Sequence, residues 1–125
     1  QDFAEAARWY RMTGEQGDVG AQYNLGVMYA NGQGVPQSFA EAARWYGLAA
    51  AQGDGGSQYN LGVMYANGQG VQQDLVQAHK WFDLAAKGSE GETRESAVKN
   101  RDFVAAKMTP AQITQAQQLA SQWKP

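Results

Sequence analysis

Hydrophobic residues recur at helical spacing in two kinds of segment that alternate along the chain. In the first kind, apolar positions three and four residues apart predict helices over Gly20–Asn31 and Gly56–Asn67. The second kind predicts helices over Phe3–Gln16, Phe39–Gln52 and Leu75–Lys87. Short glycine-containing loops separate the two kinds. We therefore expect an all-α protein.

The two kinds of helix form a repeat with an offset of 36 residues. QYNLGVMYANGQGV at 22–35 recurs unchanged at 58–71, and FAEAARWY at 3–10 recurs at 39–46. A period of this size indicates a solenoid, and copied residues mostly serve folding and stacking rather than catalysis. The expected organisation is one domain over residues 1–125, with the second half of a repeat at 1–17, repeats at 18–53 and 54–89, and a divergent C-terminal cap at 90–125.

Every helix of the second kind opens with a capping signal. A cap residue precedes Glu or Gln by three positions in the pairs Asp2/Glu5, Ser38/Glu41 and Asp74/Gln77. In such a pair the cap side chain accepts from a free backbone N–H, and the Glu or Gln side chain reaches back to the N–H of the cap. We predict reciprocal capping at all three helices. Asp18 and Asp54, which follow Gln-Gly in the turns between repeats, are also placed for turn or cap geometry.

Repeated glycines mark helix ends and close helix contacts. Gly32 and Gly68 follow Asn at the ends of the first helices, where a left-handed residue closes a helix. The second glycine of each loop is expected to permit either a positive φ or a close backbone approach. Gly26 and Gly62 stand inside helices, where each costs about 1 kcal/mol relative to Ala. We expect Trp45 and Tyr46, or their equivalents, to pack over them.

The pattern breaks after Lys87. A loop at Gly88–Gly91 is followed by a predicted polar helix over Glu92–Met108, and Thr109 and Pro110 then start a last helix. The apolar stripe of the polar helix is Ala97, Arg101, Val104 and Met108, and Glu95 and Lys99 form an i,i+4 pair. We interpret residues 92–123 as a cap over the last repeat, with Trp123 pinning it down. The amino end has no such cap, which favours a missing preceding segment or a self-association surface.

The composition of the chain excludes several kinds of binding and catalytic site. The net charge of −2 gives no general attraction to nucleic acid or to anionic membranes. The absence of cysteine excludes disulfides, thiolate metal sites and cysteine nucleophiles. No apolar run approaches the length that spans a bilayer, and we expect no signal peptide within these residues. No catalytic, nucleotide-binding or metal motif is present, so we expect no cofactor and no enzyme.

The repeated motifs resemble those of the Sel1-like repeat, a relative of the tetratricopeptide repeat. The first helices carry Leu-Gly and a Tyr three positions later, the loops carry G-x-G-V, and the second helices carry Ala and a Trp three positions later. The resemblance covers residues 1–87 strongly. It implies a right-handed superhelix of antiparallel helix pairs that acts as an adaptor for proteins or peptides. It also implies a bacterial source, with the cytoplasm or periplasm as compartment. One branch of the family binds cell-wall fragments or penicillin, but its members are rich in paired cysteines, from which this chain departs.

The same resemblance places the first helices on the concave face and so suggests a partner-binding site. Tyrosine offers flat apolar area, and an Asn amide can donate to and accept from a peptide backbone at once. The candidate residues are Tyr23, Asn24, Val27 and Asn31, with Tyr59, Asn60, Val63 and Asn67 as their copies; Ala30 and Ala66 extend one stripe, and Met28 and Met64 the other. The alternative is that the asparagines bond to neighbouring loops and the tyrosines pack within the stack.

Other candidate sites have simpler explanations. Trp9, Trp45 and Trp81 recur in register and are expected in the stacking core. His79, the only histidine, is expected at the surface or half-buried in a structural role. A second functional hypothesis is an enzyme or small-ligand site in the C-terminal third, where Glu95, Lys99, Arg101 and Asp102 form the only polar cluster. A third is an architectural segment of a longer solenoid that binds through its ends.

Overall fold

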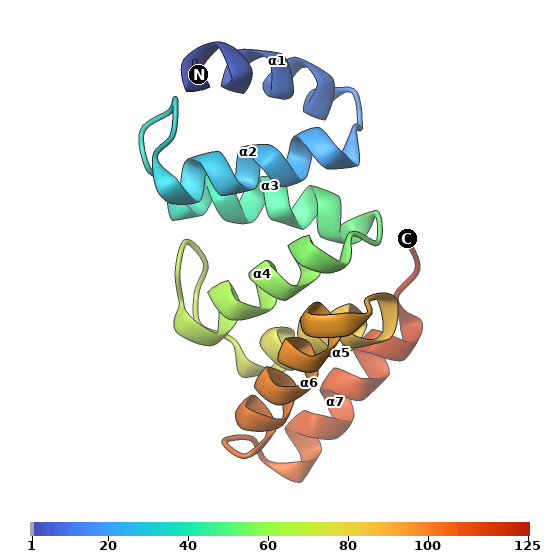
Figure 1. The fold of residues 1–125 in the computed structure, drawn as a ribbon. Coiled ribbons are helices and arrows are strands. Elements are labelled where there is room, and N and C mark those ends of the chain that lie inside the picture. Colours follow the sequence, from blue (N-terminus) through green and yellow to red (C-terminus); the bar gives the residue numbers. More distant parts are fainter. Residues whose placement is uncertain (1) are drawn as a thin grey trace.

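The computed structural model describes residues 2–125, which form seven helices and no strand (Figure 1). Gln1, the first residue of the predicted domain, lies outside the described residues. The helices are α1 (Phe3–Glu15), α2 (Val19–Asn31), α3 (Phe39–Ala51), α4 (Gly55–Asn67), α5 (Leu75–Gly88), α6 (Gly91–Ala105) and α7 (Pro110–Gln122).

The helices stack in chain order, with the first blue helix at one end and the red helices at the other (Figure 1). Each of α1 to α5 packs against the next helix along the chain. At the C-terminal end α4, α6 and α7 all pack on α5. This arrangement is an all-α helical repeat solenoid, so the predicted fold class is confirmed.

A side-chain cap starts each of the second helices. Of the two hydrogen bonds predicted for each cap, only the one accepted by the cap side chain is present. Asp2, Ser38 and Asp74 each accept a hydrogen bond from the backbone N–H three residues later. Among the described residues the reciprocal bond occurs only at α7, between Thr109 and Gln112. At α3 the Glu41 carboxylate lies 3.6 Å from Arg44 instead. The prediction of three reciprocal capping boxes was therefore wrong.

Aromatic rings cover the helix-interior glycines. A Cβ atom built on Gly26 would lie 2.6 Å from the Tyr46 ring, and one on Gly62 would lie 2.8 Å from the Phe82 ring. Such distances are too short for any real side chain, so glycine is required where the first and second helices touch. Trp45 does not take this role. Its ring packs over Gly14 of α1, where a built Cβ would lie 3.1 Å away.

The three repeated tryptophans do not share one environment. Trp45 and Trp81 are 1% and 8% exposed, as the sequence predicted, but Trp9 is 60% exposed. Trp45 is covered because α1 lies beside α3, whereas no helix of the described chain lies on the corresponding side of α1. The prediction that Trp9 is a core residue was wrong because its burial depends on a neighbour that these residues do not include.

Two buried glutamines, which no sequence pattern singled out, join successive helices. The Gln22 side chain donates to the carbonyl of Gly14 at 3.0 Å, and Gln58 donates to the carbonyl of Ala50 at 3.1 Å. These carbonyls belong to the last turns of α1 and α3, where backbone acceptors lack partners within the helix. Each amide therefore closes the end of one helix and fixes the next helix against it.

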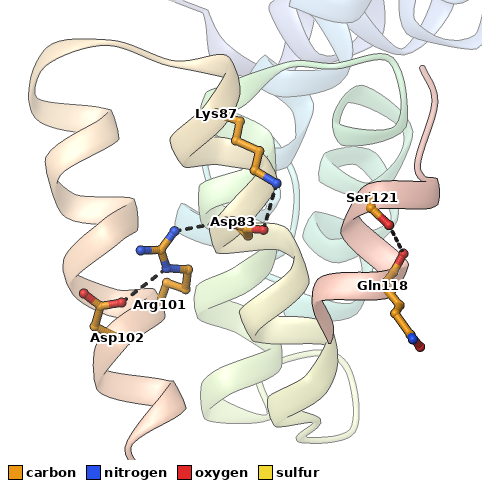
Figure 2. Close-up of polar contacts among 6 residues, drawn as sticks. All are labelled: Asp83, Lys87, Arg101, Asp102, Gln118 and Ser121. Atoms are coloured by element: carbon orange, nitrogen blue, oxygen red, sulfur yellow. Dashed lines mark hydrogen bonds and ion pairs between the residues drawn. The ribbon is translucent and has the colours of Figure 1, made fainter. Parts of the chain in front are cut away.

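The last two helices are fastened to α5 by apolar and ionic contacts. Arg101 of α6 lies 3.0 Å from the buried carboxylate of Asp83, which Lys87 also approaches to 3.2 Å (Figure 2). On the other side, Ala116 and Ala120 of α7 are buried in the core. The predicted ion pair between Glu95 and Lys99 is not among the ion pairs of residues 2–125.

The structure also corrects where α6 ends. The helix stops at Ala105 rather than Met108, because the N–H groups of Lys107 and Met108 bond to carbonyls only three residues back. Met108 is still buried, at 9% exposure. Trp123 follows α7, and its ring lies 3.8 Å from a Cβ built on Gly53 in the turn between α3 and α4. It therefore contacts the repeat stack, as predicted.

Candidate functional site

Small hollows recur along one side of the solenoid. The hollow between α1 and α2 has a volume of about 170 Å³, and the one between α2 and α4, which α3 also lines, about 140 Å³. Six residues that line the first recur 36 positions later in the second: Phe3, Tyr10, Asn24, Val27, Met28 and Gln33 correspond to Phe39, Tyr46, Asn60, Val63, Met64 and Gln69. The repeat thus builds the same small site twice.

A third hollow of about 160 Å³ continues the row between α4 and α6. Val63 borders both this hollow and the preceding one. Leu75 and Phe82 of α5 take the places that Phe39 and Tyr46 of α3 have in the second hollow. Phe103 of α6 stands at this hollow with 62% of its surface exposed, and the Lys107 ammonium lies 4.4 Å from the centre of its ring.

A fourth hollow is more polar and joins three helices. Its volume is about 260 Å³, and it is lined by Tyr23, Gly56, Tyr59, Asn60, Glu92, Thr93 and Ser96 from α2, α4 and α6. Asn60 borders both this hollow and the one between α2 and α4. We call the surface formed by these four hollows the first-helix face, because at least one of α2, α4 and α6 lines each of them.

Seven of the eight residues that the sequence suggested for partner binding line this face. The exception is Asn31, which is exposed and borders none of the four hollows. Asn67 is also exposed but lines the hollow between α4 and α6. The other six are half-buried: Tyr23, Asn24, Val27, Tyr59, Asn60 and Val63.

The two tyrosines also pack within the stack. The ring centroids of Tyr23 and Tyr46 are 6.0 Å apart, and those of Tyr59 and Phe82 are 5.7 Å apart. Asn100 of α6 donates a hydrogen bond to the Tyr59 hydroxyl at 2.9 Å. Each tyrosine therefore holds helices together with one part of its side chain and lines a hollow with another.

Asn60 stands beside the hydroxyl of Tyr46. Burial raises the pKa of Tyr46 to about 12, and the hydrogen bond from Asn60 opposes this rise only in part. Tyr46 therefore stays neutral and keeps its hydroxyl proton at physiological pH. The Asn60 amide has further donor and acceptor capacity, which faces two hollows.

Two other residue predictions need correction. Met28 and Met64, which the sequence placed on a groove stripe, are each only 5% exposed and belong mainly to the core. His79 is 4% exposed rather than half-buried, because α6 covers this side of α5. Burial lowers its pKa, and its Nδ1 atom has no hydrogen-bond partner within residues 2–125. Neutral imidazole is the form that such a site favours.

Several residues of the face were missed by sequence reasoning. Gln33 and Gln69 were treated as turn residues, and Phe39 only as a helix start, yet all three line hollows. Their recurrence in register was a signal that could have pointed to them. Phe103 has no repeat equivalent, so the sequence offered no comparable signal for it.

The polar cluster proposed for a small-ligand or catalytic site is not gathered in one place. Arg101 is held by Asp83 and Asp102 (Figure 2). Glu95 and Lys99 are exposed. The four hollows contain none of the four cluster residues. Within residues 2–125, no group of three or more His, Cys, Asp or Glu side chains could hold a metal ion. None of the described helices has the length and apolar character needed to cross a membrane.

Comparisons with known proteins agree with this architecture. The family model described as Sel1 repeat matches residues 1–18, 19–54 and 56–89. A search of curated proteins gave no significant match.

Two solved structures are similar to the whole chain. A protective antigen of uropathogenic Escherichia coli with a Sel1-like repeat (SLR) fold is 34% identical over 98% of the chain, with a TM-score of 0.89. A Sel1 repeat protein from Oxalobacter formigenes is 26% identical over 94% of the chain, with a TM-score of 0.69. The chain spans 26% of the length of the first protein and 54% of the second. Sel1 repeats generally mediate protein–protein interaction, and the matches cover most of the residues described above. This chain belongs to the Sel1 repeat family.

Proposed function

We propose that the chain is a non-catalytic adaptor that holds an extended segment of a protein partner along the first-helix face. The observation that carries this proposal is the recurrence of one hollow with the same six lining residues at a spacing of 36 positions. Shallow apolar hollows accept side chains, and amides at their borders pair with a peptide backbone. A row of such sites suits a chain segment better than a compact small molecule.

Asn60 is the residue whose replacement tests this proposal most directly. It borders two hollows and, apart from its hydrogen bond to the Tyr46 hydroxyl, it lacks the aromatic packing between helices that Tyr59 provides. We expect Asn60→Ala to weaken peptide binding about fivefold or more, since loss of one buried hydrogen-bonding partner costs about 1 kcal/mol or more. The probe is a peptide selected on the wild-type chain from a displayed library of uncharged residues, with affinity measured by fluorescence anisotropy.

The matched control removes an amide elsewhere. Gln117→Ala changes an exposed residue of α7 and should leave peptide affinity unchanged. Circular dichroism must show the same helicity in both variants. Equal affinity of wild type and Asn60→Ala would count against the first-helix face, and a loss of helicity in Asn60→Ala would show that Asn60 acts in packing.

A second candidate function is self-association through α1. Trp9 and Met12 are 60% and 50% exposed on this helix, and no described helix covers them. Joining two such surfaces would remove a large aromatic ring from water. Light scattering at increasing concentration should then detect dimers that Trp9→Glu abolishes. A wild-type chain that stays monomeric at high concentration would exclude this function.

A further inference from the structure

A second cleft lies in the layer of the second helices, between α3 and α5, with part of α4 as its floor. Its volume is about 490 Å³, the largest of the hollows described for this chain. Residues 59 and 60 of α4 face the first-helix hollows, whereas Leu61 and Tyr65 line this cleft. The two sites therefore use different sides of α4. We call this site the second-helix cleft.

Two cations border the second-helix cleft and both are held in place by aromatic rings. The Arg44 guanidinium lies 4.7 Å from the centre of the Trp45 ring, and the Lys80 ammonium lies 4.2 Å from that of Trp81. The two residues occupy the same position in successive repeats. Cation–π contact orients each side chain but does not neutralise its charge.

No carboxylate lines the second-helix cleft. Where the preceding repeat has Glu41, the residue at the cleft is the neutral Gln77. Lys80 makes no ion pair within residues 2–125, and burial lowers its pKa. Arg44 has only the exposed Glu41 at 3.6 Å. The cleft therefore has a local positive charge, although the whole chain carries −2.

One substitution between the repeats explains why this cleft is open. In the preceding repeat Arg11 donates a hydrogen bond to the Tyr29 hydroxyl, and its guanidinium lies 5.8 Å from the centre of that ring. The equivalents of these two residues are Gly47 and Tyr65. A Cβ built on Gly47 would meet nothing within 4 Å. The space that the Arg11 side chain takes up is thus vacant at the second-helix cleft, which the Tyr65 side chain borders.

We propose that the second-helix cleft docks an acidic segment of a protein partner, whose carboxylates pair with Arg44 and Lys80 while apolar side chains rest on Tyr65 and Val71. Charge complementarity selects the acidic class, because charged hydrogen bonds to Arg and Lys are strong and position-specific. The apolar floor selects a peptide over a simple inorganic anion. This site is separate from the first-helix face, so one chain can hold two partners, or two parts of one partner, on different sides.

The test uses a fluorescent peptide of alternating glutamate and leucine with an amidated C-terminus, and a matched peptide with glutamine in place of glutamate. We expect binding of the acidic peptide only, and weaker binding as salt is raised. The double variant Arg44→Gln/Lys80→Gln should lower affinity about tenfold or more, since it removes both charged hydrogen-bond donors from the cleft. The control pair Arg94→Gln/Lys99→Gln removes two exposed cations of α6 and should have no effect.

The variant Gly47→Arg distinguishes binding inside the second-helix cleft from general electrostatic attraction to the positive charges around it. It adds a positive charge but supplies the side chain that lies against Tyr29 in the preceding repeat, and we expect it to abolish binding. Thermal unfolding followed by circular dichroism verifies that each variant is folded. Binding that survives in Gly47→Arg or in the Arg44/Lys80 double variant would overturn the proposal, as would equal binding of the glutamine peptide, of inorganic phosphate or of an oligonucleotide. Asn60→Ala should leave this binding unchanged, so failure here is distinguishable from failure of the proposed function.

Discussion

Replacing Trp45 with Ala should destabilise the chain by about 3–5 kcal/mol, whereas the same replacement at Trp9 should change stability by less than about 0.5 kcal/mol. The two tryptophans stand in the same eight-residue sequence, FAEAARWY, and differ only in their position in the stack. Trp45 is 1% exposed and packs over Gly14 of α1, while Trp9 is 60% exposed. Removing the buried ring leaves a cavity, and removing the exposed ring leaves none.

Chemical denaturation followed by far-ultraviolet circular dichroism measures both effects without depending on tryptophan fluorescence. Trp9→Ala serves as the matched control because it removes the same atoms from an identical local sequence. Equal losses at the two positions would mean that local sequence, rather than stacking, determines the contribution of each tryptophan. A small loss at Trp45 would mean that the second helices do not pack as described.

Two glycine-to-alanine changes should have opposite signs. Ala in place of a helix-interior Gly gains about 1 kcal/mol of helix propensity. At Gly26 this gain is outweighed because the new methyl group would lie 2.6 Å from the Tyr46 ring, and overpacking of this kind costs about 1–3 kcal/mol or more. At Gly47 a Cβ meets nothing within 4 Å, so Gly47→Ala should stabilise the chain by about 0.5–1 kcal/mol.

The midpoint temperature of thermal unfolding, followed by circular dichroism, shows whether each replacement stabilises or destabilises the chain. Gly62→Ala should follow Gly26→Ala, since a Cβ at Gly62 would lie 2.8 Å from the Phe82 ring. A stabilising effect at Gly26 would show that Tyr46 does not press on this helix, and the account of helix pairing would then need revision.

Local signals in the sequence predicted the fold well. Helix periodicity and caps placed most helix boundaries within one residue, because the residues that start and stop a helix are its own neighbours. The boundary of α6 was less accurate, since Met108 continues the apolar stripe although the backbone has already tightened into a turn. Periodicity reports which side of a helix is apolar but not where regular hydrogen bonding ends.

Features that depend on neighbouring repeats were harder to predict. Trp9 and Trp45 have identical local sequences, so only the stacked structure shows that one is exposed. Gln22 and Gln58 look like surface residues, yet they are buried where they bond to the end of the preceding helix. Such roles arise from contacts between repeats, which periodicity alone does not contain.

Of the two candidate sites, one was predicted from the sequence and the other was not. Tyr23, Asn60 and Val63 were placed on the first-helix face by their spacing, and the hollows lie at those residues. The second-helix cleft was not foreseen. It results from the exchange of Arg11 for Gly47 between two repeats that share the segment QYNLGVMYANGQGV unchanged. Differences between copies therefore point to this second candidate site, while the shared residues point to the first.

The claim on which all of this depends is that the duplicated segments stack as helix pairs with glycine against an aromatic ring. The most direct measurement is a nuclear Overhauser spectrum of the wild-type chain that resolves the Hα protons of Gly26 and Gly62. We predict contacts from Gly26 to the Tyr46 ring and from Gly62 to the Phe82 ring, with both glycine resonances shifted upfield by the rings. Glycine resonances at random-coil positions, without contacts to these rings, would contradict the account.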